Sequence, residues 1–242
     1  MIEFKNVTKR YTIQEDKTFK EVFMSALQRK PLSVKHTVFS NLNFTILDGE
    51  TVGIIGKNGA GKSTLLKLIA GVTYPTFGQV HIHGKVAPLI ELGAGFHHEL
   101  SGYENIFLNA AILGMHKKEI ELVVDKIIEF SGIAEFIHTP VKRYSSGMYM
   151  RLGFAIAIHT NAPILLIDEV LAVGDIQFQR KCLDYLKEMK KDKSKTIVFV
   201  SHDEKAIKSF CDRAILLEDG KIVADQDPAS VIHTYHDMFK NS

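Results

Sequence analysis

The sequence predicts an α/β protein built on a mostly parallel β-sheet with helices on both faces and a helical block inserted into it. Short apolar segments alternate with helical segments from residue 164 to residue 239, as in sheets whose parallel strands are joined by crossover helices. Residues 101–158 have mainly helical apolar spacing, which indicates the insertion. A glycine-rich loop at residues 56–63 joins an apolar strand to a helix, the local pattern of a phosphate-binding loop.

The N-terminal third is predicted to form strands. Apolar and polar residues alternate over Ile2–Val7, over Asn43–Leu47 and over Gln79–His83, the period of a half-buried strand. Asp48-Gly49 indicates a turn. It leads into the apolar strand Thr51–Ile55, which ends at the glycine-rich loop.

The remaining chain is predicted to be helical at first. Tyr103–Leu113 and Glu119–Phe130 carry apolar residues three and four apart, and Tyr149–His159 is a further expected helix. The strands and helices that alternate after this block are expected at Ile164–Ile167, Phe178–Met189, Thr196–Val200, Glu204–Phe210 and Ala214–Leu217. A hairpin turn follows at Asp219-Gly220, and the last expected helix covers Ala229–Phe239.

Residues 14–36 fit neither pattern. The segment is rich in lysine, and Phe19, Phe23 and Leu27 lie at helical spacing within it. Two interpretations stay open. The segment is either an amphipathic element that meets a membrane surface or a partner's cytoplasmic helix, or a surface helix packed on its own domain.

Composition excludes several classes of protein. The 242 residues carry a net charge of +2, too small to argue for a nucleic-acid partner. Cys182 and Cys211 form no CxxC pair, so we expect buried thiols and a reducing, intracellular setting. No apolar stretch approaches the ~18 residues needed to span a bilayer, and Met1–Lys5 lacks the apolar region of a signal peptide.

The glycine-rich loop is the strongest functional signal. The loop and the residue after it are Gly56, Lys57, Asn58, Gly59, Ala60, Gly61, Lys62, Ser63 and Thr64. Its glycines let successive backbone N–H groups point at an anion, and the helix that follows adds a positive dipole. Lys62 can reach the β- and γ-phosphates of a nucleotide, and the Ser63 hydroxyl can bind Mg²⁺.

Two carboxylates follow the apolar strand Ile164–Ile167, namely Asp168 and Glu169. The carboxyl ends of parallel strands form the edge at which α/β sheets bind ligands. Asp168 fits the acidic residue that positions hydrated Mg²⁺, and Glu169 could polarise the attacking water as general base. With the phosphate loop, this pair predicts a nucleotide-hydrolysing site that uses ATP and Mg²⁺.

A second helix start also offers an anion site. The residues Tyr144, Ser145, Ser146, Gly147 and Met148 precede an expected helix, and serines cap helix N-termini. The helix dipole and its free N–H groups can then bind an anion. Because the first loop already holds a nucleotide, we expect this second site to serve a nucleotide held by another copy of the chain.

The stretch from Tyr144 to Met148 resembles the signature sequence of ABC-type ATPases, Leu-Ser-Gly-Gly-Gln, and departs from it at three positions. The resemblance covers nearly the whole chain and implies a P-loop NTPase fold with an antiparallel β part at the N-terminus. It also implies a catalytic core at residues 1–92 and 159–242, and a helical signature subdomain at residues 93–158. The partner it implies is a second copy, so that the signature residues act in trans in a homodimer.

Other residues take family roles by resemblance. Tyr11 lies where the family stacks an aromatic ring on adenine, with a core tyrosine as the alternative. Val173-Gly174-Asp175 resembles the loop that communicates across the dimer. His202 resembles the histidine that contacts the γ-phosphate and helps hold the catalytic geometry.

One family feature is missing. The glutamine that usually lies near magnesium is absent, and Glu91 is the best positional candidate for it, with a surface glutamate as the alternative. The histidine pairs 81/83 and 97/98 lack cysteine or carboxylate partners at ligand spacing, so we expect no metal there.

Residues 91–96, 144–148 and 168–175 together resemble one branch, the ATPase subunits of bacterial polysaccharide and teichoic-acid exporters, O-antigen exporters above all. The branch implies a separate transmembrane permease that moves a lipid-linked glycan outward, with the ATPase bound peripherally at the cytoplasmic face of the inner membrane. Some members continue into a carbohydrate-binding domain, so we expect that this chain, which ends at Ser242, lacks one or has been truncated. An importer or drug-exporter ATPase, or a soluble ABC-type switch, is the alternative.

Overall fold

A six-stranded sheet lies at the centre of the computed structural model, which describes residues 1–14, 33–90, 92–168, 174–191, 193 and 195–240. In this part of the chain its order is β5 (Val86–Pro88), β6 (Ile164–Asp168), β7 (Thr196–Val200), β3 (Thr51–Ile55), β8 (Arg213–Glu218) and β9 (Lys221–Gln226). The neighbouring pairs from β5 to β8 are parallel, and β9 pairs antiparallel with β8. The predicted mostly parallel sheet is confirmed.

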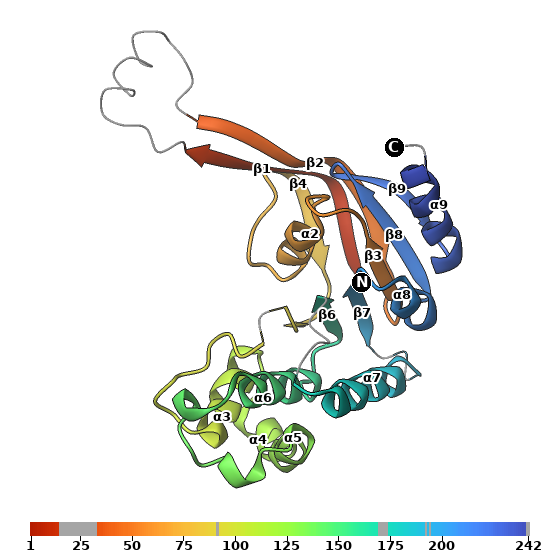
Figure 1. The fold of residues 1–242 in the computed structure, drawn as a ribbon. Helices are drawn as coiled ribbons and strands as arrows, with labels where there is room; N and C mark the ends of the chain where they lie inside the picture. The colour runs from red at the N-terminus through yellow and green to blue at the C-terminus, as the bar shows by residue number, and fades with distance from the viewer. Residues whose placement is uncertain (15–32, 91, 169–173, 192, 194, 241–242) are drawn as a thin grey trace.

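A smaller antiparallel sheet confirms the β part expected near the N-terminus. Its order is β2 (Ser33–Ile46), β1 (Ile2–Gln14) and β4 (Phe77–Ile82). Strands β1 and β2 form a long hairpin that extends away from the other elements (Figure 1).

The first two strands are longer than the sequence predicted. The first strand was predicted only over Ile2–Val7. Register shifts, one of them between Phe4 and Val7, interrupt the alternation of apolar and polar residues. Of the segment predicted as a helix, residues 14 and 33–36 belong to the hairpin strands instead, which corrects that prediction. Residues 15–32 lie outside the described residues.

The six-stranded sheet separates two hydrophobic cores. Along β7, Ile197 and Phe199 belong to one core, and Val198 and Val200 belong to the other, as the alternation of side chains in a strand requires. Helix α2 (Lys62–Ile69) packs in the core shared with the three-stranded sheet.

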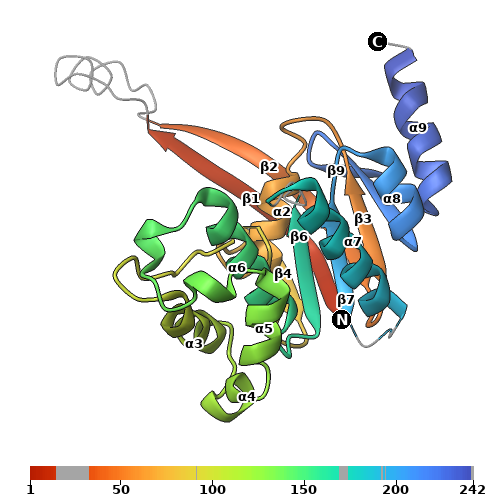
Figure 2. The same ribbon diagram turned by 60° about the horizontal axis from the view of Figure 1, so that its bottom comes forward.

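The other face of the sheet is covered by helices. The core on this face includes residues of α7 (Ile176–Lys191) and α8 (Glu204–Phe210), and α7 lies across the parallel strands in Figure 2. Helix α9 (Pro228–Lys240) contacts β8, β9 and α8. The inner parallel strands β3, β6, β7 and β8 are thus buried on both faces, which explains their continuous apolar sequences.

The inserted helices form a separate lobe (Figure 1). They are α3 (Gly102–Ile112), α4 (Lys117–Glu121), α5 (Val124–Ser131) and α6 (Ser146–Ile158), with short 3₁₀ turns at Ala134–Phe136 and Val141–Arg143. The division at residues 92/93 and 158/159 stays a prediction. No helix in the described ranges has both the length and the apolar character needed to cross a membrane.

One predicted helix is wrong in its continuity. Glu119–Phe130 was expected as a single helix, but the structure breaks it between α4 and α5. Val123 N–H donates to the carbonyl of Ile120 in a tight turn, and Leu122 is left 80% exposed. The two β-branched residues Val123 and Val124 have low helix propensity, which favours the break at this point.

Candidate functional site

The phosphate loop joins β3 to α2 in the predicted conformation. All five residues of β3 are buried, so the strand delivers the loop to the carboxyl edge of the sheet. Gly59 and Gly61 have φ angles of 86° and 106°, where glycine is strongly preferred. A Cβ on Gly61 would also lie 2.6 Å from the Phe39 ring. Gly61 is the N-cap of α2 and gives it no side-chain cap, so the first N–H groups of α2 are not capped by that residue.

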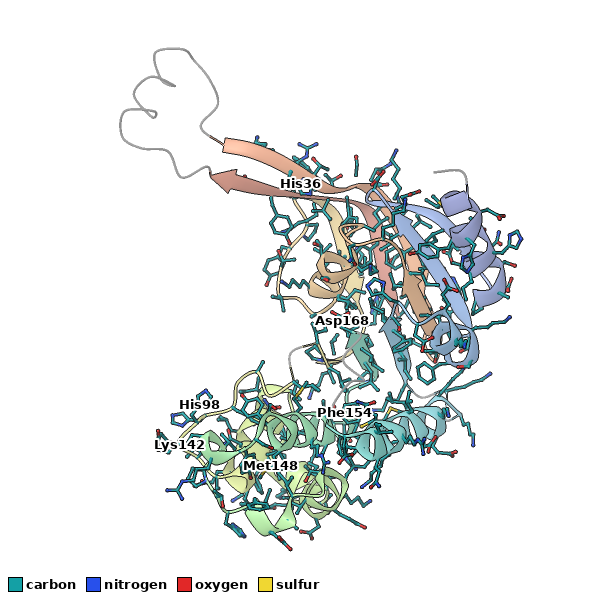
Figure 3. All side chains as sticks on the ribbon, in the orientation of Figure 1. His36, His98, Lys142, Met148, Phe154 and Asp168 are labelled. Atoms are coloured by element: carbon teal, nitrogen blue, oxygen red, sulfur yellow. The ribbon has the colours of Figure 1, made fainter. Side chains whose placement is uncertain are left out.

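A cavity of about 440 Å³ lies against this loop. It is lined by Tyr11, His36, Val38, Asn58, Gly59, Gly61, Lys62, Ser63, Thr64, Asp168 and His202. Nine of these residues were predicted from the sequence, and the fold brings them together from four separate parts of the chain. His36 and Val38 were not predicted. Figure 3 labels His36 on the long hairpin and Asp168 at the end of β6.

Lys62 and Asp168 form the charged end of the cavity. The Lys62 side chain is only 8% exposed, and its Nζ donates to the carbonyls of Gly56 at 2.6 Å and Lys57 at 3.0 Å. Burial lowers the pKa of Lys62, and the nearby Asp168 carboxylate opposes that shift. Burial likewise raises the pKa of Asp168, against the opposing charges of Lys62 and His202. A phosphate in the cavity would compensate the buried ammonium.

Parallel pairing explains why Asp168 and His202 meet. Asp168 is the partner of Val200 in the register of β6 and β7, so the two strands end at the same edge, and His202 follows two residues later. The turn is fixed on both sides of His202: Asp203 N–H donates to Ser201 Oγ at 3.0 Å. Asp203 Oδ1 in turn accepts from the first turn of α8.

The two unpredicted residues lie on β2. Val38 Cγ1 lies 3.0 Å from the position that a Cβ on Gly61 would take, and His36 is the register partner of Tyr11. Period-2 spacing alone could not have found them, because the neighbours Val38 and Phe39 both approach Gly61 and a register shift of the hairpin falls at this point. Residue 36 also lay in the segment 14–36, which was interpreted as a helix.

A second cavity of about 470 Å³ lies at the start of α6. It is lined by Ser145, Ser146, Gly147, Met148, Met150, Arg151, Gly174 and Asp175. It shares no residue with the first cavity. The structure thus brings all four predicted signature residues together with Asp175, the predicted dimer-loop residue, and holds them apart from the chain's own phosphate loop.

Hydrogen bonds set the shape of the second cavity. Ser145 caps α6, since its Oγ accepts from Met148 N–H at 3.2 Å. Asp175 is paired with the Arg151 guanidinium and accepts from Phe178 N–H at 2.8 Å. These contacts lower the pKa of Asp175, the bond from Phe178 most of all. The Arg151 charge is therefore already paired within the chain.

Tyr144, which replaces the usual leucine of the signature, anchors this region to the helical lobe. Its hydroxyl donates to the carbonyl of Phe136 at 2.9 Å, and burial raises its pKa. A Cβ on Gly102 would lie 2.1 Å from the same hydroxyl, so the tyrosine is closely packed against α3.

Some predicted site residues lie outside the described residues. They include Glu169, the predicted general base, and Glu91, the predicted substitute for the magnesium-proximal glutamine. Val173 of the predicted dimer loop is also outside, whereas Gly174 and Asp175 are described. The roles of Glu169 and Glu91 stay predictions from the sequence.

Comparison with known proteins gives a family and close relatives. A family model described as "ABC transporter" matches residues 39–172. The chain is 45% identical to the O-antigen export system ATP-binding protein RfbB of Klebsiella pneumoniae, over 97% of each chain. It is 43% identical to the teichoic acids export ATP-binding protein TagH of Bacillus anthracis, over 99% of this chain and 43% of that relative.

Solved structures agree with the fold. The chain matches a dimeric structure of MJ0796, a bacterial ABC transporter cassette, with a TM-score of 0.73 and 25% identity. The match covers 94% of this chain and 99% of that one. A second MJ0796 structure, a dimeric post-hydrolysis state bound to ADP and Pi, matches with a TM-score of 0.74 at 24% identity, over 94% and 99% of the two chains.

Proposed function

This chain belongs to the ABC transporter family, and on that premise we propose that it drives export of a lipid-linked polysaccharide through a separate membrane subunit. As a family member the chain binds and hydrolyses ATP. The observation that carries the cargo class is the near full-length identity with an O-antigen export ATP-binding protein. The teichoic acids export relative supports a cargo of the same general class.

The first cavity supplies the groups that ATP needs. The loop amides and the Lys62 ammonium hold the phosphates, and Tyr11 offers an aromatic face to the adenine. The Ser63 hydroxyl and the Asp168 carboxylate both line the cavity, and oxygen donors of this kind suit Mg²⁺. These two residues would hold the ion, which supplies charge neutralisation at the phosphates.

The reaction itself is assigned to two residues. Glu169 follows Asp168 directly, and as general base it would take the proton of the water that attacks the γ-phosphate. His202 lines the same cavity and would contact the γ-phosphate, which holds the water and the phosphate in line. A cavity closed to bulk water strengthens each of these electrostatic contacts.

The second cavity completes the site of another copy. Its serine hydroxyls and the N-terminus of α6 would bind the γ-phosphate of ATP held by the partner's loop. Two copies related by a two-fold axis make two such composite sites, an arrangement supported by the dimeric relatives of known structure. ATP favours the closed dimer, and hydrolysis removes the γ-phosphate link and permits opening.

The membrane spans would come from a partner subunit. One relative is named as the ATP-binding protein of an O-antigen export system, a name that implies further subunits. We place this chain peripherally on the cytoplasmic face of the membrane, where ATP is available. Alternating closure and opening of the ATPase dimer would then be transmitted to the permease.

The cargo is tested in the source cell. Replacing the chromosomal copy with Glu169→Gln should leave lipid-linked glycan inside and remove the surface polymer. Glu121→Gln is the matched control, since Glu121 is an exposed residue of α4 paired only loosely with Lys117 at 3.8 Å. If the purified Glu169→Gln protein no longer hydrolyses ATP but the cells that carry it have normal surface glycan, the proposed cargo is wrong. The assignment as an ATPase would still stand. Co-purification of a permease for another solute would favour the other transporter classes.

A further inference from the structure

The first cavity continues from the phosphate loop to two rings on the long hairpin. Tyr11 of β1 and His36 of β2 are partners in the antiparallel register, and both line the cavity. Directly opposite residues of an antiparallel pair point to the same face, with Cβ atoms about 4.5–5.5 Å apart. The phenol and the imidazole therefore both belong to the wall of this cavity, on neighbouring strands.

Val38 sets the distance between this ring pair and the phosphates. Its contact with the loop at Gly61 fixes one point of β2 against the phosphate site. His36 lies two residues from Val38 along β2 and lines the same cavity, which separates the two by up to about 7 Å. The order along the wall is thus loop, Val38 and ring pair, which matches the order of phosphates, ribose and base in a nucleotide.

Lys9 holds the tyrosine ring in place. Lys9 is 8% exposed, and its Nζ donates to Thr73 Oγ1 at 2.5 Å and to the carbonyl of Tyr74 at 2.7 Å. The same Nζ lies 4.7 Å from the centroid of the Tyr11 ring. A cation over an aromatic face attracts it, so the ring is preorganised, and Lys9 itself does not line the cavity.

We propose that His36 is a second base-binding residue, which widens the Tyr11 ring into a two-ring platform that selects purines. The inference rests on the ATP binding proposed above. A purine has a six-membered ring fused to a five-membered ring, and one phenol ring covers only part of that surface. The adjacent imidazole of His36 extends the stacking surface to the remainder. A pyrimidine, with one ring, gains little from the second residue.

The test compares three ligands on the purified chain: ATP, UTP and inorganic tripolyphosphate. His36→Ala should weaken ATP binding by about 5–10-fold, in line with the loss of one aromatic–base contact, and UTP binding by about twofold or less. Tripolyphosphate affinity should not change, because it has no base. His36→Phe should restore most of the ATP affinity, since it keeps a ring. Thr37→Ala is the matched control, because Thr37 is the exposed neighbour on the other face of β2.

Two results would overturn the inference. An unchanged ratio of ATP to UTP affinity in His36→Ala would remove the residue from base recognition. Equal losses for all three ligands would place its effect at the phosphates or in folding, and the melting temperature of the variant distinguishes those two causes. A wild-type chain that binds none of the three ligands would instead contradict the proposed function, and the inference with it.

Discussion

Two helices of this chain begin at cavities of similar size, about 440 Å³ at α2 and about 470 Å³ at α6. Both present free N–H groups and a positive dipole end. Around α2 the fold adds a buried ammonium at Lys62, a carboxylate at Asp168 and an aromatic ring at Tyr11. Around α6 it adds hydroxyl groups and Gly147, and its guanidinium at Arg151 is already paired with Asp175.

The caps of the two helices explain the difference in task. Gly61 gives the start of α2 no side-chain cap, so a bound phosphate can accept hydrogen bonds from the N–H groups there. Ser145 caps α6 itself and keeps its hydroxyl proton to donate. The first cavity can therefore hold a free, highly charged nucleotide. The second suits a phosphate that another site has already neutralised, which fits the proposal that the chain carries one full site and one complementary half.

The largest expected effect concerns Glu169, which follows Asp168 in the sequence. Glu169→Gln should slow hydrolysis by about 10²–10⁴-fold, because the amide cannot take the proton of the attacking water. ATP binding should survive, since the loop and Lys62 are intact. Single-turnover hydrolysis and equilibrium ATP binding, measured on the same preparation, check both parts. Near-normal turnover would remove Glu169 from the role of general base.

A smaller effect is expected when the first cavity loses its cation. Lys62→Ala should weaken ATP binding by about 10–100-fold, the range for a lost hydrogen bond to a charged group. Isothermal titration with a non-hydrolysable ATP analogue measures it. Lys67→Ala is the control, because Lys67 lies on the same helix but does not line this cavity. Unchanged affinity in Lys62→Ala would contradict the assignment of the loop.

A substitution in the second cavity should reduce ATP hydrolysis but leave ATP binding by the single chain unchanged. Gly147→Asp puts a negative charge at a proposed phosphate site, and hydrolysis should fall at least about tenfold. A Cβ at Gly147 would lie 3.9 Å from its nearest neighbours, so Gly147→Ala should fold and hydrolyse ATP within about threefold of wild type. Equal rates for the two variants would show that charge at this position has no effect.

The phosphate loop and several elements of the sheet could be predicted from the sequence. The phosphate loop was predictable because its requirements are local: glycines at fixed spacing, an apolar strand before them and a helix after them. The strand β7 and the helix α8 were predicted at their observed bounds, Thr196–Val200 and Glu204–Phe210, because apolar runs and polar caps mark their ends.

Non-local features were not predictable in the same way. The pairing of Tyr11 with His36 depends on register shifts in the hairpin, which no single-strand pattern records. The helix break at Leu122 leaves a large apolar side chain in solvent, whereas the helix prediction assumed that apolar residues at helical spacing are buried. The closeness of Asp175 to the signature residues was not predicted, since the resemblance gave each of them a family role but did not place them together.

The smallest expected effect is a pH dependence of stability. Burial raises the pKa of Asp168 in the folded chain, so the folded chain keeps this proton at pH values where the unfolded chain has lost it. The contribution of Asp168 to stability therefore falls as the pH rises from below the ordinary carboxyl pKa through the raised folded pKa. The Asp168→Asn variant has no carboxyl group at this position and so does not lose this stability. As the pH rises through that range, its melting temperature without nucleotide should increase by a few degrees relative to that of the wild type. A difference in melting temperature between variant and wild type that does not change with pH would contradict the raised pKa of Asp168.

The central claim is that a full site on one copy works with the half site of another. Mixing Lys62→Ala with Gly147→Asp tests it directly, because each mixed dimer has one composite site with both halves intact. With equal amounts of the two variants and random pairing, half of the dimers are mixed and one of their two sites works, so the mixture should hydrolyse ATP at about a quarter of the wild-type rate. A rate equal to the mean of the two variants measured separately would contradict the claim.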